Sequence, residues 1–430
     1  MTSAVASVQV CEICRTEIDE LSPASVCPSC GGLLELRHSF LDGGESLSAL
    51  FADRRRATRG PDASGVWRYR ELVLPSARAD EIVTHPEGNT PLLESRAVAR
   101  WAGWDSSEQL LIKHEGHNPT GSFKDRGMTV AITQAKRSAA RAVACASTGN
   151  TSASLAAYAA RAELPALVFV PKGKVAAGKL AQTIAYGART LFVRGGFDEC
   201  LALARSASAE LGIQLLNSVN PFRIEGQKTI VFELLEQLGW NVPDWIALPA
   251  GNLGNTSAFG KALRDAREAG LIDRVPRLCA VQAAGAAPFA RSFAHGFAER
   301  ITVEPETIAT AIRIGAPASW NRAVRAIRDT NGVVASVSDA EILEAKAVID
   351  AAGIGCEPAS AASVAGVRKL LQSGTISRGD RVVAVLTGHL LKDPDAVSDY
   401  HAARTADRPH ANPPIEIEPR VSEVERAMRA

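Results

Sequence analysis

Lys124 stands where a lysine could act as a nucleophilic amine. It follows the turn-forming residues 118–121 and opens an expected helix, within the segment NPTGSFKDRG. The partial positive charge of a helix N-terminus lowers the pKa of an ammonium and leaves the free amine that imine formation needs. Lysine is also scarce, with 11 lysines among 48 basic residues, and arginine cannot replace it in this chemistry. The alternative is a solvated lysine at a helix start.

Two polar loops each join an expected strand to an expected helix. The loop CASTGNTSAS at 145–154 offers hydroxyls, amides and free helix N–H groups, which suit a carboxylate, and Asn150 could donate to a phenolic oxygen. The loop PAGNLGNTSAFG at 249–260 presents successive backbone N–H groups to a phosphate, from Gly251, Asn252, Leu253, Gly254 and Asn255. Either loop alone could be a plain turn. Together with Lys124 they are the set that pyridoxal phosphate chemistry on an amino acid requires.

Four cysteines lie close together near the N-terminus. They form two Cys-x-x-Cys pairs separated by twelve residues: Cys11 with Cys14, and Cys27 with Cys30. Four thiolates at this spacing suit one tetrahedral zinc ion with no open coordination position, so we expect a structural site. An iron site and a pair of disulfides are the alternatives. The other cysteines stand singly in apolar surroundings and are expected to be inert core residues: Cys145, Cys200, Cys279 and Cys356.

Composition excludes several classes of protein. The chain has 430 residues, 46% of them hydrophobic, and a net charge of +1, so it has room for two or three domains with a real core. The balanced charge argues against nucleic acid and anionic membranes as partners. We find neither a membrane-spanning segment nor a basic, apolar leader, and therefore expect a cytoplasmic protein.

The elements that must position these residues follow an alternating pattern. Short apolar runs alternate with alanine-rich amphipathic runs from about residue 88, which predicts an α/β fold with a largely parallel sheet. The expected strands are 110–114, 142–146, 166–170, 190–193, 214–218, 245–248, 278–282, 333–337 and 382–386. The expected helices are 124–138, 151–162, 197–211, 225–238, 256–269, 340–352 and 359–371, with Ser338 and Glu341 as a capping box before the sixth.

These patterns divide the chain into four parts. Residues 1–38 form the four-cysteine unit, and the arginine-rich residues 39–85 form a connecting segment. Residues 86–406 form the catalytic region of two α/β subdomains, the smaller at about 125–220. Residues 407–430 are a proline-containing tail that either wraps the surface or ends disordered.

Several motifs between residues 85 and 400 are similar to those of threonine synthases. The segments PTGSFKDRG, STGNT (147–151), GNLGN (251–255) and LTGHLLKDP (386–394) occur in the order found in that family. Dehydratases share PTGSFKD, whereas NSVNPFRIEGQKT (217–229) and TAIRIGAPASW (310–320) are more particular to threonine synthases. The resemblance implies a two-domain pyridoxal phosphate enzyme of fold type II, the tryptophan-synthase-β-like fold, here carrying an N-terminal zinc ribbon.

The resemblance also implies a role for each matching residue. Lys124 would bind the cofactor and move protons, Asn150 would bond the ring hydroxyl, and Thr387 would face the pyridine nitrogen with a neutral hydroxyl. Residues 251–255 would hold the cofactor phosphate. The candidates for the substrate carboxylate are Ser147, Thr148, Asn150 and Thr151. The candidates for the substrate phosphate are Lys113, Asn217, Ser218 and Arg223, and Arg223 has the alternative of a structural ion pair at a strand end.

The implied reaction converts O-phospho-L-homoserine and water to L-threonine and phosphate. Relatives of this kind are commonly homodimers. The alternatives are another fold type II enzyme, such as a cysteate synthase, a threonine dehydratase or a paralogue in a specialised pathway, and a non-catalytic zinc-ribbon protein on a degenerate scaffold. A dehydratase has no need of the substrate-phosphate residues at 217–223.

Overall fold

The fold is built on two separate β-sheets that the chain visits in turn. We describe a computed structural model that covers residues 7–39, 43–173, 177–406 and 408–429. The large sheet has the order β12-β11-β10-β13-β5-β4 and is parallel except for β4. Its strands are β4 (Leu92–Glu94), β5 (Leu110–His114), β10 (Trp245–Pro249), β11 (Arg277–Ala283), β12 (Val333–Val337) and β13 (Val382–Leu386).

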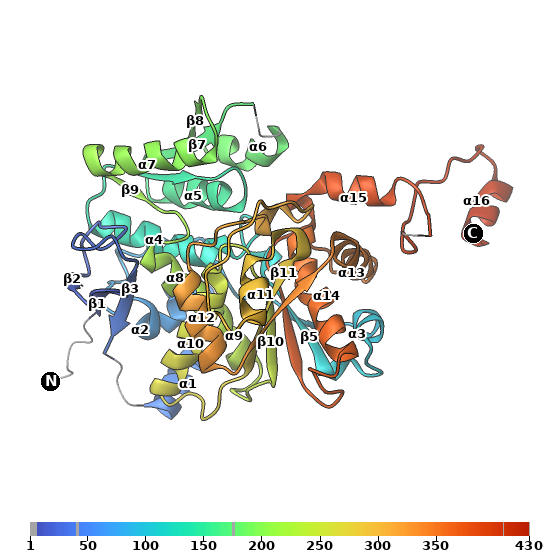
Figure 1. The fold of residues 1–430 in the computed structure, drawn as a ribbon, viewed down its shortest axis with the longest axis horizontal. Coiled ribbons are helices and arrows are strands. Elements are labelled where there is room, and N and C mark those ends of the chain that lie inside the picture. Colours follow the sequence, from blue (N-terminus) through green and yellow to red (C-terminus); the bar gives the residue numbers. More distant parts are fainter. Residues whose placement is uncertain (1–6, 40–42, 174–176, 407, 430) are drawn as a thin grey trace.

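The small sheet is inserted between β5 and β10. It is parallel, with the order β8-β7-β6-β9, and its strands are β6 (Ala142–Ala146), β7 (Ala166–Pro171), β8 (Arg189–Val193) and β9 (Ile213–Leu215). Its helices are α5 (Asn150–Arg161), α6 (Ala177–Ala185) and α7 (Phe197–Leu211). Figure 1 shows this part above the large sheet, with α4 (Lys124–Arg137) and α8 (Pro221–Gln227) between the two.

Two glycines allow α4 and α8 to pack closely. A Cβ atom on Gly127 of α4 would lie 2.7 Å from the carbonyl oxygen of Arg223, and one on Gly226 of α8 would overlap the carbonyl oxygen of Arg126. Only glycine permits this approach of the two backbones. The contact brings Arg223 of α8 to the helix that begins at Lys124.

Helices cover both faces of the large sheet. One face packs on α14 (Pro358–Gln372), α13 (Asp339–Ala351) and α3 (Arg96–Ala102), and the core on the other face continues through α4 and α5 into the small sheet. The other helices are α1 (Gly44–Arg54), α2 (Arg70–Val73), α9 (Thr229–Gln237), α10 (Gly254–Glu268), α11 (Pro288–Ala294), α12 (Trp320–Asp329), α15 (Pro394–His401) and α16 (Val421–Arg429). Among the described residues, no helix is both long enough and apolar enough to span a membrane.

The four-cysteine unit is a three-stranded antiparallel sheet that docks on the helices. Its strands are β1 (Ser7–Cys11), β2 (Glu17–Asp19) and β3 (Leu34–His38), in the order β2-β1-β3. His38 of β3 is buried, with Nε2 2.8 Å from the Glu225 carboxylate of α8 and Nδ1 2.8 Å from the Ser7 hydroxyl. Burial lowers the pKa of His38, so the neutral ring donates from Nε2 and accepts at Nδ1. Arg322 of α12 donates to the carbonyl of Leu34 at 2.5 Å.

The expected strands are all present, and four of them have the expected bounds: 110–114, 142–146, 333–337 and 382–386. The capping box of Ser338 and Glu341 is confirmed as well. The expected helix 225–238 is two helices, and the first begins earlier, at Pro221, because the Asn220 side chain accepts a hydrogen bond from the backbone N–H of Phe222.

Two segments of the chain differ from the expected pattern. The segment 39–85, expected as a connector, contributes to the main core through the fully buried side chains of Trp67 and Tyr69. Within the tail, residues 421–429 form α16, which lies apart from the body in Figure 1.

The four single cysteines are buried, as expected, and burial raises the pKa of the Cys145 and Cys279 thiols to about 12.

Replacing His38 tests how firmly the N-terminal unit is docked. His38→Ala leaves Glu225 without one buried hydrogen bond, so we expect the free energy of unfolding to fall by about 1–3 kcal/mol. Urea unfolding followed by tryptophan fluorescence measures it. The exposed His295→Ala serves as the control and should change stability by less than ~0.5 kcal/mol. An equally small change for His38→Ala would contradict the docking described here.

Candidate active site

The turn before Lys124 is fastened to the end of the central strand β13. The backbone N–H of Phe123 donates to the carbonyl of Thr387 at 3.0 Å, and the N–H of His389 donates to the carbonyl of Gly121 at 2.9 Å. An isolated bridge also joins Ser122 to Gly388. Lys124 and Thr387, which are far apart in the sequence, therefore lie at the same edge of the large sheet.

Asp125 braces the same turn from within. Its carboxylate accepts the Thr120 backbone N–H at 2.7 Å and the Thr120 hydroxyl at 2.6 Å. Burial raises the pKa of Asp125 to about 6, against the lowering effect of these hydrogen bonds. The Thr and Asp of PTGSFKD thus hold the backbone that presents the lysine.

The amine of Lys124 lies in a setting that favours its neutral form. The side chain is half-buried. The pKa of Lys124 is lowered to about 7, chiefly by burial and also by the charge of Arg223, while Glu357 opposes both effects. A substantial fraction of the amine is therefore unprotonated at neutral pH, as the sequence indicated, although burial is the main cause.

Arg223 is a fully buried cation on α8. Its guanidinium donates to the carbonyl of Leu216 and to Oε1 of Gln227, both at 3.3 Å. In the described parts of the chain no carboxylate pairs with it, and its Nε has no hydrogen-bond partner. Burial lowers the pKa of Arg223 to about 10, which leaves the group charged at neutral pH. The expected alternative, a structural ion pair, is therefore not formed among the described residues.

The loop 251–255 leads into α10 in the form expected for an anion cradle. Leu253 has a left-handed backbone with φ of 63°, and α10 begins at the next residue, so the first N–H groups of the helix have no intrahelical acceptor. A Cβ on Gly251 would lie 2.9 Å from the Cα of Ile312, so a side chain there would collide with a neighbouring loop. Asn255 is held by Gln227, whose Nε2 donates to it at 3.0 Å.

Side chains around this loop bring together further expected residues. Nδ2 of Asn252 donates to the hydroxyl of Ser218. Asn217 exchanges two hydrogen bonds with the backbone of Ala146, at 3.1 and 3.2 Å, so the expected phosphate contacts lie next to the strand that leads into the loop 147–151. In that loop Ser147, Thr148 and Thr151 are half-buried.

Asn150 and Thr387 each have a neighbour that sequence reasoning did not single out. Nδ2 of Asn150 donates to the carboxylate of Glu357, at 3.0 Å to Oε2 and 3.3 Å to Oε1. The hydroxyl of Thr387 lies 3.0 Å from that of Ser360 on α14. The motif CEPASAAS contains both Glu357 and Ser360, but their partners are distant in the sequence, so no local pattern reveals the contacts.

Lys113 does not join the expected contacts of the substrate phosphate. Its ammonium is fully buried and donates to the carbonyl of Thr90 at 2.7 Å, to Glu233 at 2.6 Å and to Gln237 at 2.8 Å. These three acceptors use all three N–H groups. Lys113 therefore has no donor left for a substrate phosphate, and this expectation is corrected.

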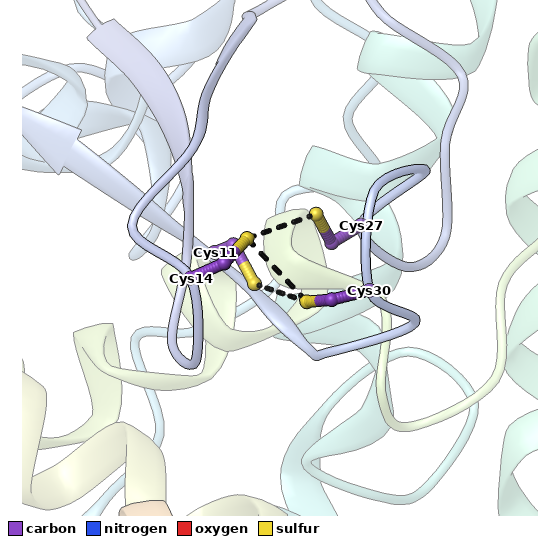
Figure 2. A group of neighbouring side chains, drawn as sticks. All are labelled: Cys11, Cys14, Cys27 and Cys30. Atoms are coloured by element: carbon purple, nitrogen blue, oxygen red, sulfur yellow. Dashed lines mark hydrogen bonds between the residues drawn. The ribbon is translucent and has the colours of Figure 1, made fainter.

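The four cysteines of the N-terminal unit converge on one point, as Figure 2 shows. Their sulfur atoms all lie within 4.8 Å of one another, and Cys11 and Cys14 are each 3.4 Å from the sulfur of Cys30. A tetrahedral zinc site with bonds of about 2.3 Å separates its sulfurs by roughly 3.8 Å. No pair is at the disulfide distance of about 2.05 Å, and all four are free thiols. The geometry fits a tetrahedral metal ion.

Comparison with known proteins assigns the chain to a family. The family model described as pyridoxal-phosphate dependent enzyme matches residues 83–388. The threonine synthase of Methanosarcina acetivorans is 47% identical, over 90% of this chain and 93% of its own. That of Mycobacterium leprae is 51% identical, over 80% and 92%. The chain belongs to the threonine synthase family.

Solved structures agree on the fold. The threonine synthase of Escherichia coli matches with a TM-score of 0.72 and 18% identity, covering 98% of this chain and 94% of that one. A threonine deaminase from Solanum lycopersicum matches with a TM-score of 0.61 and 19% identity, covering 82% and 86%. The chain has the α/β architecture of fold type II and is a pyridoxal-phosphate-dependent lyase.

The lowered pKa of Lys124 predicts an unusual labelling profile. In the cofactor-free protein, acylation of Lys124 should rise with pH around a midpoint near 7, because only the neutral amine reacts and it predominates above its pKa. Mass spectrometry of the digest gives the extent of labelling at each pH. Free N-acetyl-lysine, with a pKa of about 10.4, is the reference. A midpoint above pH 9 for Lys124 would contradict the assignment.

Proposed function

We propose that the chain converts O-phospho-L-homoserine and water to L-threonine and phosphate, with pyridoxal phosphate bound at Lys124. The observation that carries the proposal is that Lys124, whose amine is partly neutral, lies near Arg223, a buried guanidinium with no carboxylate partner among the described residues. The first suits an aldehyde cofactor and the second suits a phosphorylated substrate. The family, identified from relatives 47–51% identical, agrees with both.

The residues present fit the cofactor. In our proposal the backbone N–H groups of residues 251–255 hold its phosphate, Asn150 donates to its ring oxygen, and the Thr387 hydroxyl faces its ring nitrogen. When bound, pyridoxal phosphate supplies an electron sink that stabilises negative charge at substrate carbons. A neutral hydroxyl at the ring nitrogen moderates that sink relative to a carboxylate.

The substrate is proposed to lie between the two sheets. Its phosphate would face Arg223, Ser218, Asn217 and Asn252, and its carboxylate would face the loop 147–151, where Ser147, Thr148 and Thr151 offer hydroxyls and α5 offers its first N–H groups. The dianionic phosphate would then neutralise the buried guanidinium of Arg223. This double anchorage orients the carbon chain with its Cα toward Nζ of Lys124.

Lys124 is proposed to perform the proton transfers. Its neutral Nζ would take the proton from the substrate Cα and release it within the site before taking one from Cβ, and phosphate would leave from Cγ. A proton would then be returned at Cγ, water would add at Cβ, and a proton would be returned at Cα. The sum consumes one water and releases one phosphate for each threonine.

Turnover tests the proposal. The cofactor-loaded protein mixed with O-phospho-L-homoserine should yield threonine and phosphate in equal amounts by proton and phosphorus NMR. Lys124→Ala should lower the rate by at least ~10³-fold, because it removes the base that acts in every proton transfer. The surface variant Lys369→Ala should leave it unchanged.

The product distribution separates the alternatives. Phosphate with a keto acid in place of threonine would indicate elimination chemistry and contradict the proposed product. Absence of turnover with folded, cofactor-loaded protein would contradict O-phospho-L-homoserine as the substrate.

Arg223 should matter for the substrate and little for folding. Arg223→Leu removes a buried, unpaired cation, so its free energy of unfolding should stay within about 1 kcal/mol of the parent or increase. The KM for the phosphorylated substrate should rise about 100-fold, equivalent to 2–3 kcal/mol of charged hydrogen bonding. Steady-state kinetics and urea unfolding measure the two effects.

Arg322→Leu is the matched control for that experiment. Arg322 is also buried, but it pairs with Glu12 and binds the carbonyl of Leu34, so its loss should lower stability and leave KM unchanged. An unchanged KM in Arg223→Leu would remove Arg223 from the substrate site.

We propose zinc as the occupant of the four-cysteine site, with a structural role. Metal analysis of the purified protein should give one zinc per chain and no iron, and Cys27→Ser should lower the zinc content and the thermal midpoint. Cys279→Ser, at a buried single cysteine, is the control for zinc content. One iron per chain would contradict zinc.

We further propose that the protein is a cytoplasmic homodimer. The proposed zinc–thiolate site and the four buried single cysteines agree with a reducing compartment, and the family resemblance supports the dimer.

A further inference from the structure

Glu357 is a buried carboxylate at the edge of the proposed cofactor site. It is the N-cap residue of α14, and its backbone N–H donates to the carbonyl of Gly388 at 3.1 Å. Its carboxylate packs against that glycine, since a Cβ on Gly388 would lie 2.5 Å from the Glu357 Cδ. The residue is 4% exposed. Glu357 is therefore fixed beside Thr387 and away from solvent.

Its hydrogen-bonding environment is sparse for a buried carboxylate. Within the described ranges, the only side-chain hydrogen bonds to it come from Nδ2 of Asn150, at 3.0 and 3.3 Å. Burial raises the pKa of Glu357, and the charge of Asp393 adds to this effect. The hydrogen bond from Asn150 and the cations Lys392, in the segment after β13, and Lys124 favour the ionised carboxylate. The carboxylate thus connects α14, which packs on the large sheet, to Asn150, the first residue of α5 beside the small sheet.

This contact determines which way the Asn150 amide faces. An ionised carboxylate only accepts hydrogen bonds, so the NH₂ group of Asn150 must face Glu357 and its carbonyl oxygen must face away. The NH₂ group has a second N–H, which remains for another acceptor. Without the carboxylate, the amide could rotate by 180° and present its oxygen in place of that N–H.

We infer that Glu357 is a positioning residue for the cofactor, which acts through Asn150. Its carboxylate fixes the amide so that the second N–H of Asn150 is directed to the ring oxygen of pyridoxal phosphate. The inference rests on the proposed function, because it takes Asn150 to contact that oxygen. It assigns a specific task to a residue that lies on a different helix from every cofactor contact proposed above.

A double-mutant cycle tests the inference in the cofactor-loaded protein. The variants are Glu357→Gln, Asn150→Ala and the two combined. The readouts are the dissociation constant of pyridoxal phosphate and the pH midpoint of its visible absorption band. Glutamine can both donate and accept, so Glu357→Gln should weaken cofactor binding by about 10-fold, the worth of one hydrogen bond, and shift the pH midpoint. The combined variant should bind no more weakly than Asn150→Ala, since both changes remove the same interaction.

Two further variants keep the test decisive. Glu357→Asp retains the charge but is one methylene too short to hold the amide, and it should behave as Glu357→Gln does. Glu344→Gln removes a partly exposed carboxylate that binds Trp101 and Arg368, and it should leave both readouts unchanged.

Several results would overturn the inference. They are parental binding and spectrum in Glu357→Gln, parental behaviour in Glu357→Asp, and fully additive losses in the combined variant. Each would occur in a parent that binds the cofactor, and each would leave the proposed function intact. A parent that binds no pyridoxal phosphate would instead overturn the proposed function together with the inference.

Discussion

Two buried or half-buried cations without carboxylate partners are the feature on which the rest of the site depends. Burying an unpaired charge is costly, and other fully buried cations among the described residues are paired. Glu233 accepts hydrogen bonds from Lys113, Arg126 and Arg68 at 2.6–3.2 Å behind the site, and Glu225 is paired beneath the N-terminal unit. Lys124 and Arg223 depart from that rule. The structure thus holds charge where an aldehyde and a phosphate are proposed to bind. The pKa of Lys124 falls mainly because the amine is buried, and the nearby charge of Arg223 lowers it as well.

The fold serves this arrangement by bringing distant segments to one place. The lysine turn is bonded to the backbone after β13, α4 packs on α8 through glycines, and Gln227 of α8 holds Asn255 in the phosphate loop. The N-terminal unit supports the opposite side of α8, where His38 binds Glu225. Arg223 lies on the same short helix, so the four-cysteine unit supports the element that presents a proposed substrate ligand.

Much of this organisation follows from local sequence. Strand bounds came from apolar runs flanked by polar turns, and the lysine turn and the phosphate loop came from residue types whose backbone or side-chain chemistry is restrictive. What could not be predicted depends on contacts between distant residues. The sequence shows Lys113 only as a cation near a motif, whereas its burial against Glu233 comes from packing of β5 on α9. The bond between Asn150 and Glu357 joins residues 207 positions apart. The start of α8 was missed although Asn220–Pro221 is a local helix-start pattern, because an alanine-poor helix of seven residues has little periodicity.

The most direct test of the central claim is a crystal structure of the cofactor-loaded protein with a phosphonate analogue of O-phospho-L-homoserine. We expect phosphonate oxygens to lie about 2.7–3.2 Å from the guanidinium of Arg223 and the cofactor to be joined to Nζ of Lys124. A phosphonate bound elsewhere, with Arg223 still contacting only Leu216 and Gln227, would contradict it.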